Sequence, residues 1–382
     1  MADVRPFPAL RYDPARVGDL GRVVAPPYDV IPDDQLQVYR DRSPWNVVRL
    51  IRPGTDYESA ARLLADWKRE GVLRRDPPAM YVHEVAFAGR RRLDLLAALR
   101  LQPYSDRVVL PHELTHRGPK EDRLALMRAT GAALEPLWFL YEGEGTALPA
   151  LLGEAVEARP AVEFEFPEGE RHRLWAIESP QWHRSVSEAL AALPALIADG
   201  HHRYETTLAF SQELGGGPDA PSRFTPALLT DLVDPGLEVL PTHRLMRTGV
   251  AVTGGEEVAS LEEMLGKLEG RVAAGVYRDH EFQVLELEGE VPVVELHRQV
   301  VDNILGRKSL EENVYYTRDA AEAVREVDAG RAVSAFFLPK PDLGVVLRQA
   351  REGMTFPQKT TYFHPKPPSG MVFHTLDPDR AL

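Results

Sequence analysis

Hydrophobic residues recur along this chain with two different spacings, and the spacing changes from segment to segment. In residues 57–73 (YESAARLLADWKREGVL), the apolar stripe of Ala60, Leu63, Leu64 and Trp67 predicts an amphipathic helix ending near Gly71. Residues 119–132 (PKEDRLALMRATGA) predict a second helix, again followed by a glycine stop.

Other apolar runs are too short for helices and predict strands. Residues 79–101 contain two such runs joined across Ala88–Gly89–Arg90, which is typical of a hairpin, and residues 135–142 (EPLWFLYE) predict a buried strand. Residues 172–200 predict a strand, a helix and a strand in turn. We expect a further hairpin over residues 282–297 (FQVLELEGEVPVVELH).

Helices and strands therefore mix without strict alternation, which indicates an α+β (mixed α/β) fold. With 382 residues, of which 44% are hydrophobic, the chain is long enough for two domains. We expect an N-terminal α+β domain over residues 1–170 and a C-terminal α+β domain over residues 171–382.

The net charge, the absence of cysteine and the absence of long apolar runs exclude several classes of function. A net charge of -13 argues against a general nucleic-acid-binding surface but leaves room for one small anion in a locally basic pocket. The absence of cysteine excludes disulfides, a thiolate nucleophile and cysteine-ligated zinc. Neither a signal-peptide core nor an apolar run of about 20 residues is present, so we expect a cytoplasmic protein with no membrane partner.

The segment IADGHHRYETTLAF (residues 197–210) carries the main candidate chemistry. It predicts a buried strand, a turn at Gly200, and a helix whose first turn holds His201, His202 and Arg203. Unpaired backbone N–H groups and the positive end of the helix dipole lie in that turn, so cations there are unfavourable unless an anion is bound. The pattern therefore predicts a phosphate site, with Gly200, His201, His202 and Arg203 as nucleotide-binding residues.

Asp199 precedes this turn and could act as a base, hold Mg²⁺ or orient a histidine. We assign catalytic roles to Asp199, Glu113 and His202, and the metal position to Asp199. The structural alternative is that Asp199 caps the helix and that the histidines are ordinary surface residues.

The stretch ADGHHRYETTLAF resembles the phosphate motif of the ParB/sulfiredoxin superfamily over about 40 residues. This superfamily includes nucleotide-binding ParB proteins, the ATP-using enzyme sulfiredoxin and free-serine kinases. The resemblance implies a ParB/sulfiredoxin-like nucleotide-binding core, supplemented here by further mixed-sheet regions, with ATP or ADP and Mg²⁺ as cofactors. The sulfiredoxin reaction itself is not expected, because this chain has no cysteine.

A wider resemblance spans nearly the whole chain. The signatures RPFPALRY, APPYDVI, HELT with GPKEDR, ADGHHRYETTL, LPTHRL and FPQKTTYFHPKPPSGMVF occur in that order. Together they look like the uncharacterised bacterial and archaeal family called domain of unknown function 1015. That family name implies no reaction.

Four other clusters could contribute to a site. HELTH (residues 112–116) satisfies the zinc-hydrolase pattern HExxH, although Pro111 and a following Gly-Pro make a poor helical context. Lys120 and Arg123 are spaced to clamp a phosphate, or else belong to a solvated charged turn. Lys359 or Lys366 could reach a terminal phosphate from the proline-rich loop, whose aromatics could equally be a hydrophobic plug. Thr242, His243 and Arg244 in LPTHRL offer a possible second anion contact, or a satisfied loop.

These features favour a nucleotide-dependent phosphotransferase that acts on a small hydroxylated metabolite, with free serine as the most concrete acceptor. The first alternative is a nucleotide-sensing regulatory protein of the ParB type, and the second is a zinc hydrolase that uses HELTH. The expected partners are a nucleotide and a small-molecule substrate.

Overall fold

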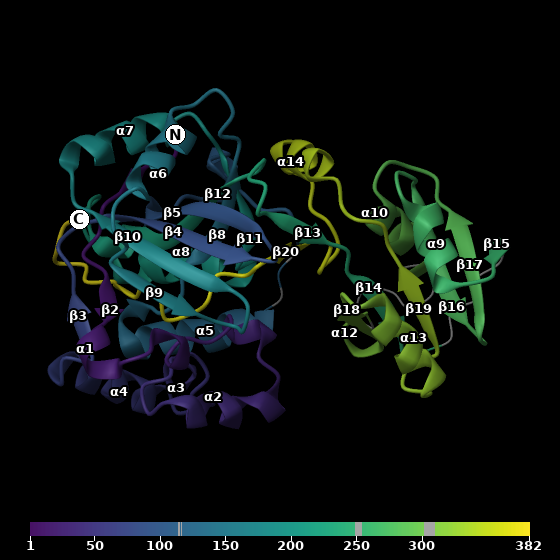
Figure 1. Ribbon diagram of the computed structural model, residues 1–382, viewed down its shortest axis with the longest axis horizontal. Helices are drawn as coiled ribbons and strands as arrows, with labels where there is room; N and C mark the ends of the chain where they lie inside the picture. Colours follow the sequence, from purple (N-terminus) through teal and green to yellow (C-terminus); the bar gives the residue numbers. More distant parts are fainter. Residues whose placement is uncertain (114, 116, 249–253, 302–309) are drawn as a thin grey trace. The chain divides into compact units, whose positions relative to one another are not determined.

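The chain forms two compact units, both of which are made from non-contiguous segments (Figure 1). The computed structural model describes residues 1–113, 115, 117–248, 254–301 and 310–382. Unit 1 comprises Met1–Pro111, Thr115–Leu237 and Pro365–Leu382, and unit 2 comprises His112–Leu114 and Glu238–His364.

These units do not follow the expected boundary between residues 170 and 171. That boundary lies between strands β9 (Val162–Glu165) and β10 (Arg171–Ile177), which pair with each other in one sheet. The C-terminal residues from Pro365 onward return to unit 1, so no single cut of the sequence separates the two units.

Unit 1 is built on a mixed sheet that has nine strands within the described residues. The strand order is β6-β11-β8-β12-β5-β4-β10-β9, with β1 also paired to β5. The pairs β6–β11 and β8–β12 are parallel and the others are antiparallel. The remaining strands are β1 (Val4–Arg5), β4 (Met80–Phe87), β5 (Arg90–Arg100), β6 (Val109–Leu110), β8 (Leu137–Tyr141), β11 (Ala195–Asp199) and β12 (Phe224–Asp231). Two short ladders pair β2 (Leu10–Tyr12) with β3 (Leu73–Arg75) and β7 (Ala132–Ala133) with β21 (His374–Thr375).

Two sets of helices accompany this sheet. Leu148 and Leu152 of α6 and Val186 and Leu190 of α7 are buried in the same apolar cluster as one face of the strands. Helices α5 and α8 pack against each other, and α4 packs against α5. The helices of unit 1 are α1 (Pro14–Val17), α2 (Leu36–Arg42), α3 (Val48–Ile51), α4 (Tyr57–Arg69), α5 (Arg117–Thr130), α6 (Leu148–Ala155), α7 (Pro180–Leu190) and α8 (His201–Leu214).

Unit 2 contains an antiparallel sheet with the strand order β15-β17-β16-β19-β14-β18 in its described part. Its strands are β14 (His243–Met246), β15 (Glu256–Val258), β16 (Ala273–Arg278), β17 (Glu281–Glu286), β18 (Val314–Thr317) and β19 (Ser334–Phe337). A separate pair joins β13 (Glu238–Leu240) to β20 (Tyr362–His364). The helices are α9 (Leu261–Leu268), α10 (Pro292–Leu296), α12 (Leu310–Asn313), α13 (Ala320–Asp328) and α14 (Leu343–Arg351).

Most of the predicted elements are present, and the mixed α/β class is confirmed. Asp56 is the N-cap of helix α4, and its side chain accepts a hydrogen bond from the Ser59 backbone N–H. Of the predicted apolar stripe, Ala60, Leu64 and Trp67 are buried, whereas Leu63 is partly exposed. None of the described helices combines the length and the apolar composition needed to cross a bilayer.

The predicted hairpin over residues 282–297 is wrong. Strand β17 pairs instead with the preceding β16, and the chain then forms α10 from Pro292 onward. Proline suits the first position of a helix, because its missing N–H would have no helical partner there. The β-branched run that suggested a strand therefore lies in a helix.

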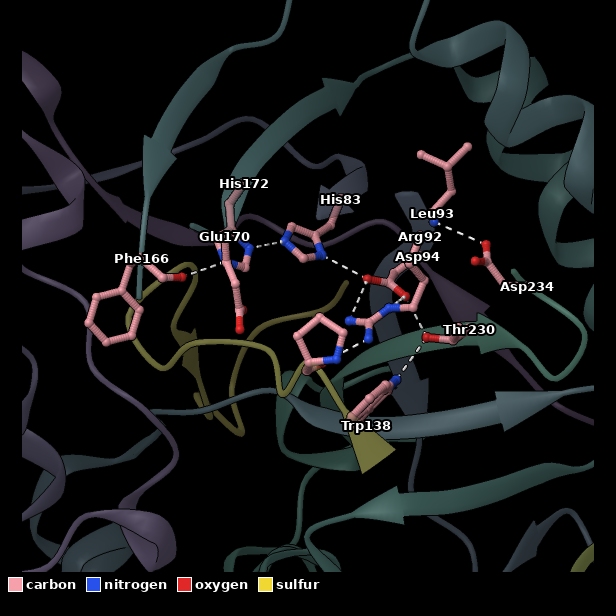
Figure 2. Close-up of polar contacts among 11 residues, drawn as sticks. His83, Arg92, Leu93, Asp94, Trp138, Phe166, Glu170, His172, Thr230 and Asp234 are labelled. Atoms are coloured by element: carbon pink, nitrogen blue, oxygen red, sulfur yellow. Dashed lines mark hydrogen bonds and ion pairs between the residues drawn. The ribbon is translucent and has the colours of Figure 1, made fainter. Parts of the chain in front are cut away.

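One face of the unit 1 sheet is apolar, whereas alternate positions on the same strands carry a buried polar network (Figure 2). Arg92 and Asp94 lie on β5, and their side chains are joined by two hydrogen bonds of 2.8 and 3.2 Å. Asp94 also accepts from His83 Nδ1 at 2.8 Å and from the hydroxyl of Thr230. All four side chains are fully buried or nearly so.

The hydrogen-bond partners of His172 show which of its ring nitrogens carries a proton. His172 Nε2 lies 2.7 Å from the carbonyl oxygen of Phe166, which can only accept, so this nitrogen donates. Burial lowers the pKa of His172 well below its usual value, so the ring is neutral and its Nδ1 accepts. His83 Nε2 lies 2.9 Å from His172 Nδ1, and His83 Nδ1 lies 2.8 Å from Asp94 Oδ2, so the two rings link the Phe166 carbonyl to the carboxylate.

The network holds the C-terminal segment as well as the sheet. Arg92 Nη1 donates to the carbonyl oxygen of Pro365 at 2.7 Å, while its guanidinium carbon lies 4.4 Å from the centre of the Trp138 ring. Burial alone would raise the pKa of Asp94, but the charge of Arg92 and the hydrogen bond from His83 lower it to about 2. A permanently ionised Asp94 thus orients the arginine that fixes Pro365.

We expect Asp94→Asn to reduce the free energy of unfolding by about 3–5 kcal/mol at neutral pH, because it leaves Arg92 buried without its counter-charge. The wild-type contribution should be complete above pH ~4, the ordinary range of an aspartate, and should disappear as the pH falls toward about 2. Urea unfolding at several pH values measures both effects. Asp34→Asn, which alters an exposed aspartate, is the control; equal stability of the two variants would contradict this role.

Candidate functional site

The segment with the DGHHR motif forms a strand, a glycine turn and a helix, as predicted. Strand β11 runs to Asp199, and α8 begins at His201 and ends at Leu214. Gly200 occupies the N-cap position of α8, and no side chain caps the helix there. The first hydrogen bond of the helix runs from Tyr204 N–H to the carbonyl of Gly200 at 2.8 Å.

Only glycine fits at position 200. Its φ of +101° lies in the left-handed region, which side chains disfavour. A Cβ atom would lie 2.9 Å from Leu137 Cδ2 and 3.2 Å from the guanidinium carbon of Arg203. The turn therefore brings the backbone close to both side chains.

Two cations converge on the carboxylate of Asp199. Arg203 Nη2 donates to Asp199 Oδ2, and Lys366 Nζ pairs with Asp199 Oδ1. The exposed fractions of the three side chains are only 9%, 9% and 11% for Asp199, Arg203 and Lys366. These residues come from the end of β11, the first turn of α8 and the C-terminal segment.

Arg203 is also held from the other side. Its Nη1 donates to the carbonyl of Pro136 at 3.0 Å and lies 4.0 Å from Glu135 Oε1. Burial would lower the pKa of Arg203, but the carboxylates of Glu135 and Asp199 raise it above the usual value. Its guanidinium therefore stays charged and braces the turn, which differs from the open phosphate clamp that the sequence suggested.

Glu135 is a member of this cluster that the sequence did not single out. It accepts from the backbone N–H of Tyr28 at 3.1 Å and from the hydroxyl of Ser369 at 2.6 Å. The only sign of Glu135 in the sequence is its position directly before the apolar run PLWFLY, where an acidic residue adjoins a buried strand. Through Glu135, the APPYDVI and PPSG segments meet beside Arg203.

The other basic residues proposed for unit 1 have partners within the protein. Lys120 Nζ donates to Glu205 Oε2 at 2.8 Å and so links α5 to α8. Arg123 Nη1 donates to the carbonyl of Ile51 at 2.7 Å, and its guanidinium carbon lies 4.2 Å from the centre of the Tyr28 ring.

A small cavity of about 40 Å³ lies nearby in unit 1. Its polar lining residues are Arg123, Glu135, Arg203 and Thr207. At that volume it holds about one water molecule and no nucleotide.

His201 and His202 differ in exposure. His201 is buried at 7%, whereas His202 is partly exposed in the first turn of α8. The His202 carbonyl accepts from the hydroxyl of Thr206 at 2.7 Å, within the helix. His202 is thus the histidine of the pair that solvent and a ligand can reach.

The remaining proposed residues, Glu113 and Lys359, belong to unit 2. Glu113 Oε1 accepts from the backbone N–H groups of Thr360 and Thr361, at 3.0 and 3.3 Å. His112 Nε2 lies 2.8 Å from the Thr361 hydroxyl oxygen. Lys359 is exposed, with a φ of +53°. In this structure Glu113 therefore shapes the 360–361 backbone.

The LPTHRL motif joins the same loop. Arg244 is fully buried and donates to the carbonyls of Thr242, Gln358 and Lys359, the last at 3.1 Å. Burial lowers the pKa of His243 to about 4, so this ring is neutral and its Nδ1 accepts from the Leu338 N–H at 3.3 Å. These side chains are committed to the fold of unit 2.

The residues present do not form a metal site. Asp199, the proposed Mg²⁺ ligand, already pairs with two cations, whereas Mg²⁺ requires several oxygen ligands. In the described parts of the chain, no three His, Asp or Glu side chains are grouped as metal ligands would be. His112 and Glu113 precede α5 instead of lying on a helix, and His116, the other histidine of HELTH, lies outside the described residues.

Several solved structures have some similarity to this chain. They include a conserved hypothetical protein from Pyrococcus furiosus (TM-score 0.41, 17% identity, covering 73% of this chain and 94% of that chain). A free serine kinase in complex with AMP has a TM-score of 0.44 and 15% identity, with 74% and 91% of the two chains covered. SbnI with a C-terminal truncation, from Staphylococcus aureus, has a TM-score of 0.36 and 11% identity, with 72% and 86% covered. TM-scores at this level establish neither a common fold nor a common activity.

Sequence comparison gives a clearer result. Comparison with curated proteins yields no match. A family model described as "Protein of unknown function (DUF1015)" matches residues 4–328, which is most of the chain and contains the first five of the six signatures. The chain belongs to the DUF1015 family.

Proposed function

We propose that this protein is a nucleotide-dependent phosphotransferase that acts on a small hydroxylated metabolite, with the phosphates bound at the start of α8. The observation that carries the proposal is the turn at Gly200, where a strand end, an uncapped helix N-terminus and the ammonium of Lys366 come together. The resemblance of ADGHHRYETTLAF to the ParB/sulfiredoxin phosphate motif supports the same assignment.

The physical basis is the electrostatics of the turn. The first backbone N–H groups of α8 have no helical acceptor, and the helix dipole places partial positive charge there. Gly200 lets a phosphate approach the backbone closely, because it has no Cβ atom. His202, the partly exposed residue of this turn, would add a side-chain donor.

Lys366 and Arg203 would then have different tasks. Lys366 reaches Asp199 from a separate segment and can exchange that contact for a phosphate oxygen, since Asp199 keeps its bond to Arg203. Arg203 stays on Asp199 and Pro136 and holds the turn in shape. Asp199 would orient the two cations.

Phosphoryl transfer joins the acceptor hydroxyl oxygen to phosphorus, breaks the bond to the leaving nucleotide oxygen and releases the hydroxyl proton to a base. Both carboxylate oxygens of Asp199 already face cations, so Asp199 is poorly placed for that role. We therefore propose His202, in the first turn of α8, as the proton acceptor. Glu113 belongs to unit 2 and accepts two backbone N–H groups there, so it is not part of the proposed step. ATP or ADP would be the donor.

Lys366→Ala should weaken nucleotide binding by about 10- to 150-fold, because a hydrogen bond to a charged group contributes roughly 1.5–3 kcal/mol. Titration calorimetry with ATP and with ADP measures the change. Lys68→Ala, which removes an exposed lysine from α4, is the control and should bind like the wild type. Equal affinity of the two variants would remove Lys366 from the site.

Arg203→Ala should lower stability as well as affinity. It leaves the buried carboxylate of Asp199 with one cation fewer, and breaking a buried pair costs about 3–5 kcal/mol. Arg203→Lys should recover little, because a single ammonium cannot bind both Pro136 and Asp199 in the geometry of the fork. Melting temperatures measured beside nucleotide titrations test this. A variant that melts like the wild type but no longer binds would instead show direct phosphate contact.

Turnover separates an enzyme from a nucleotide sensor. We expect ATP or ADP to be consumed only when an acceptor is present, with serine and other small hydroxylated metabolites as the panel, and to raise the melting temperature even without an acceptor. Phosphorus NMR identifies the product. Nucleotide binding without transfer to any member of the panel would favour the sensor.

A further inference from the structure

Unit 2 contains a cavity of about 210 Å³ that is independent of the turn at Gly200. Its apolar walls come from three segments that are distant in sequence: Val272, residues 291–293 and residues 338–346. Val291, Val293, Leu338 and Val346 are each at most 9% exposed. The volume equals about seven times the ~30 Å³ that a water molecule takes up in the liquid. It suits a molecule of roughly ten non-hydrogen atoms.

The lining includes a buried hydroxyl group, that of Thr242, which forms no hydrogen bond with the described residues. Thr242 is 4% exposed, and among the described residues its hydroxyl has no hydrogen-bond partner. The other threonine of the lining, Thr360, is satisfied, since its hydroxyl donates to the carbonyl of Pro357 at 2.6 Å. Buried hydroxyl groups are normally paired, so the Thr242 hydroxyl calls for a partner in the cavity.

The charged residues around the cavity leave one cation available. Arg271 forms an ion pair with Glu286. Glu290 Oε2 lies 4.0 Å from Arg348 Nη2. The carboxylate of Asp342 accepts hydrogen bonds from backbone N–H groups at the start of α14. Lys340 is exposed and has no ion-pair partner in the described part of the chain. An anionic group on a ligand is the natural complement of this lysine.

We propose that this cavity binds a small carboxylic acid with an apolar body and one further polar group. Its carboxylate pairs with Lys340, its apolar body fills the space between the valines and Leu338, and its hydroxyl or carbonyl bonds to the Thr242 hydroxyl. Behind the wall, the neutral ring of His243 holds the Leu338 backbone N–H and keeps the pocket in shape. The site requires no nucleotide and does not depend on the proposed phosphotransfer.

The test uses the full chain and four probes. They are 4-hydroxyphenylacetate and 6-hydroxyhexanoate, with phenylacetate as the analogue lacking the hydroxyl and 4-hydroxyphenylacetamide as the analogue lacking the charge. Ligand-observed NMR should detect the two hydroxy acids in the millimolar range or tighter, as expected for molecules of this size. Phenylacetate and the amide should both bind more weakly than 4-hydroxyphenylacetate.

Variants then separate the two contacts. Thr242→Val keeps the shape and should weaken binding of the hydroxy acids by about 3- to 10-fold, leave phenylacetate unchanged, and leave the melting temperature of the free protein undiminished. Lys340→Gln should weaken the acids but not the amide, whereas Lys267→Gln, on α9 outside the lining, should change neither.

Two results would overturn the site: no binding of either hydroxy acid at about 10 mM, or binding that Thr242→Val and Lys340→Gln leave intact. Nucleotide affinity of the Thr242→Val protein is measured in parallel. Thr242 and Lys366 belong to different units. If the wild-type protein binds no nucleotide, this result would therefore contradict the proposed phosphotransferase function but not the proposed acid-binding cavity.

Discussion

The ionised carboxylate of Asp199, buried between two cations, is the interaction on which the candidate site depends. It joins the end of β11 to the first turn of α8 through Arg203, and to the C-terminal segment through Lys366. A buried charge without partners would be strongly unfavourable, so the three segments are stable only together. The glycine turn is thereby fixed, with Gly200 at the N-cap position of α8.

The buried polar network on the unit 1 sheet also helps to position Lys366. Lys366 can reach Asp199 because Pro365, one residue before it, is held by Arg92. Arg92 in turn is oriented by Asp94, whose other contacts lead through His83 to His172. A run of buried hydrogen bonds of this kind stabilises only when every member is satisfied. Burying so many polar groups is unfavourable unless all of them are paired. The network that fixes Pro365 therefore agrees with a functional role for the neighbouring Lys366.

Sequence patterns predicted what depends on neighbours along the chain and missed what depends on distant ones. The strand, Gly200 and α8 follow from local periodicity and turn chemistry, so they were predictable. Glu135 was not, since its partners Tyr28 and Ser369 are far from it in sequence. The two units could not be separated by one boundary, because unit 1 is completed by the final residues of the chain. The contacts of Arg203 with the carbonyl of Pro136 and the carboxylate of Glu135 were not predictable for a related reason, because both residues are distant from it in sequence.

The family signatures divide into two groups with different physical tasks. In unit 1, residues 199–203 and 366 concentrate charge around the turn at Gly200, where no side chain caps α8. In unit 2, the charged side chains of Glu113 and Arg244 form hydrogen bonds with backbone groups of residues 358–361. A carboxylate that accepts two backbone N–H groups and an arginine that donates to three carbonyls stabilise the shape of a loop. Because that loop also supplies Thr360 to the unit 2 cavity, the signatures of unit 2 are better explained by the shape of a binding pocket than by the chemistry of phosphate.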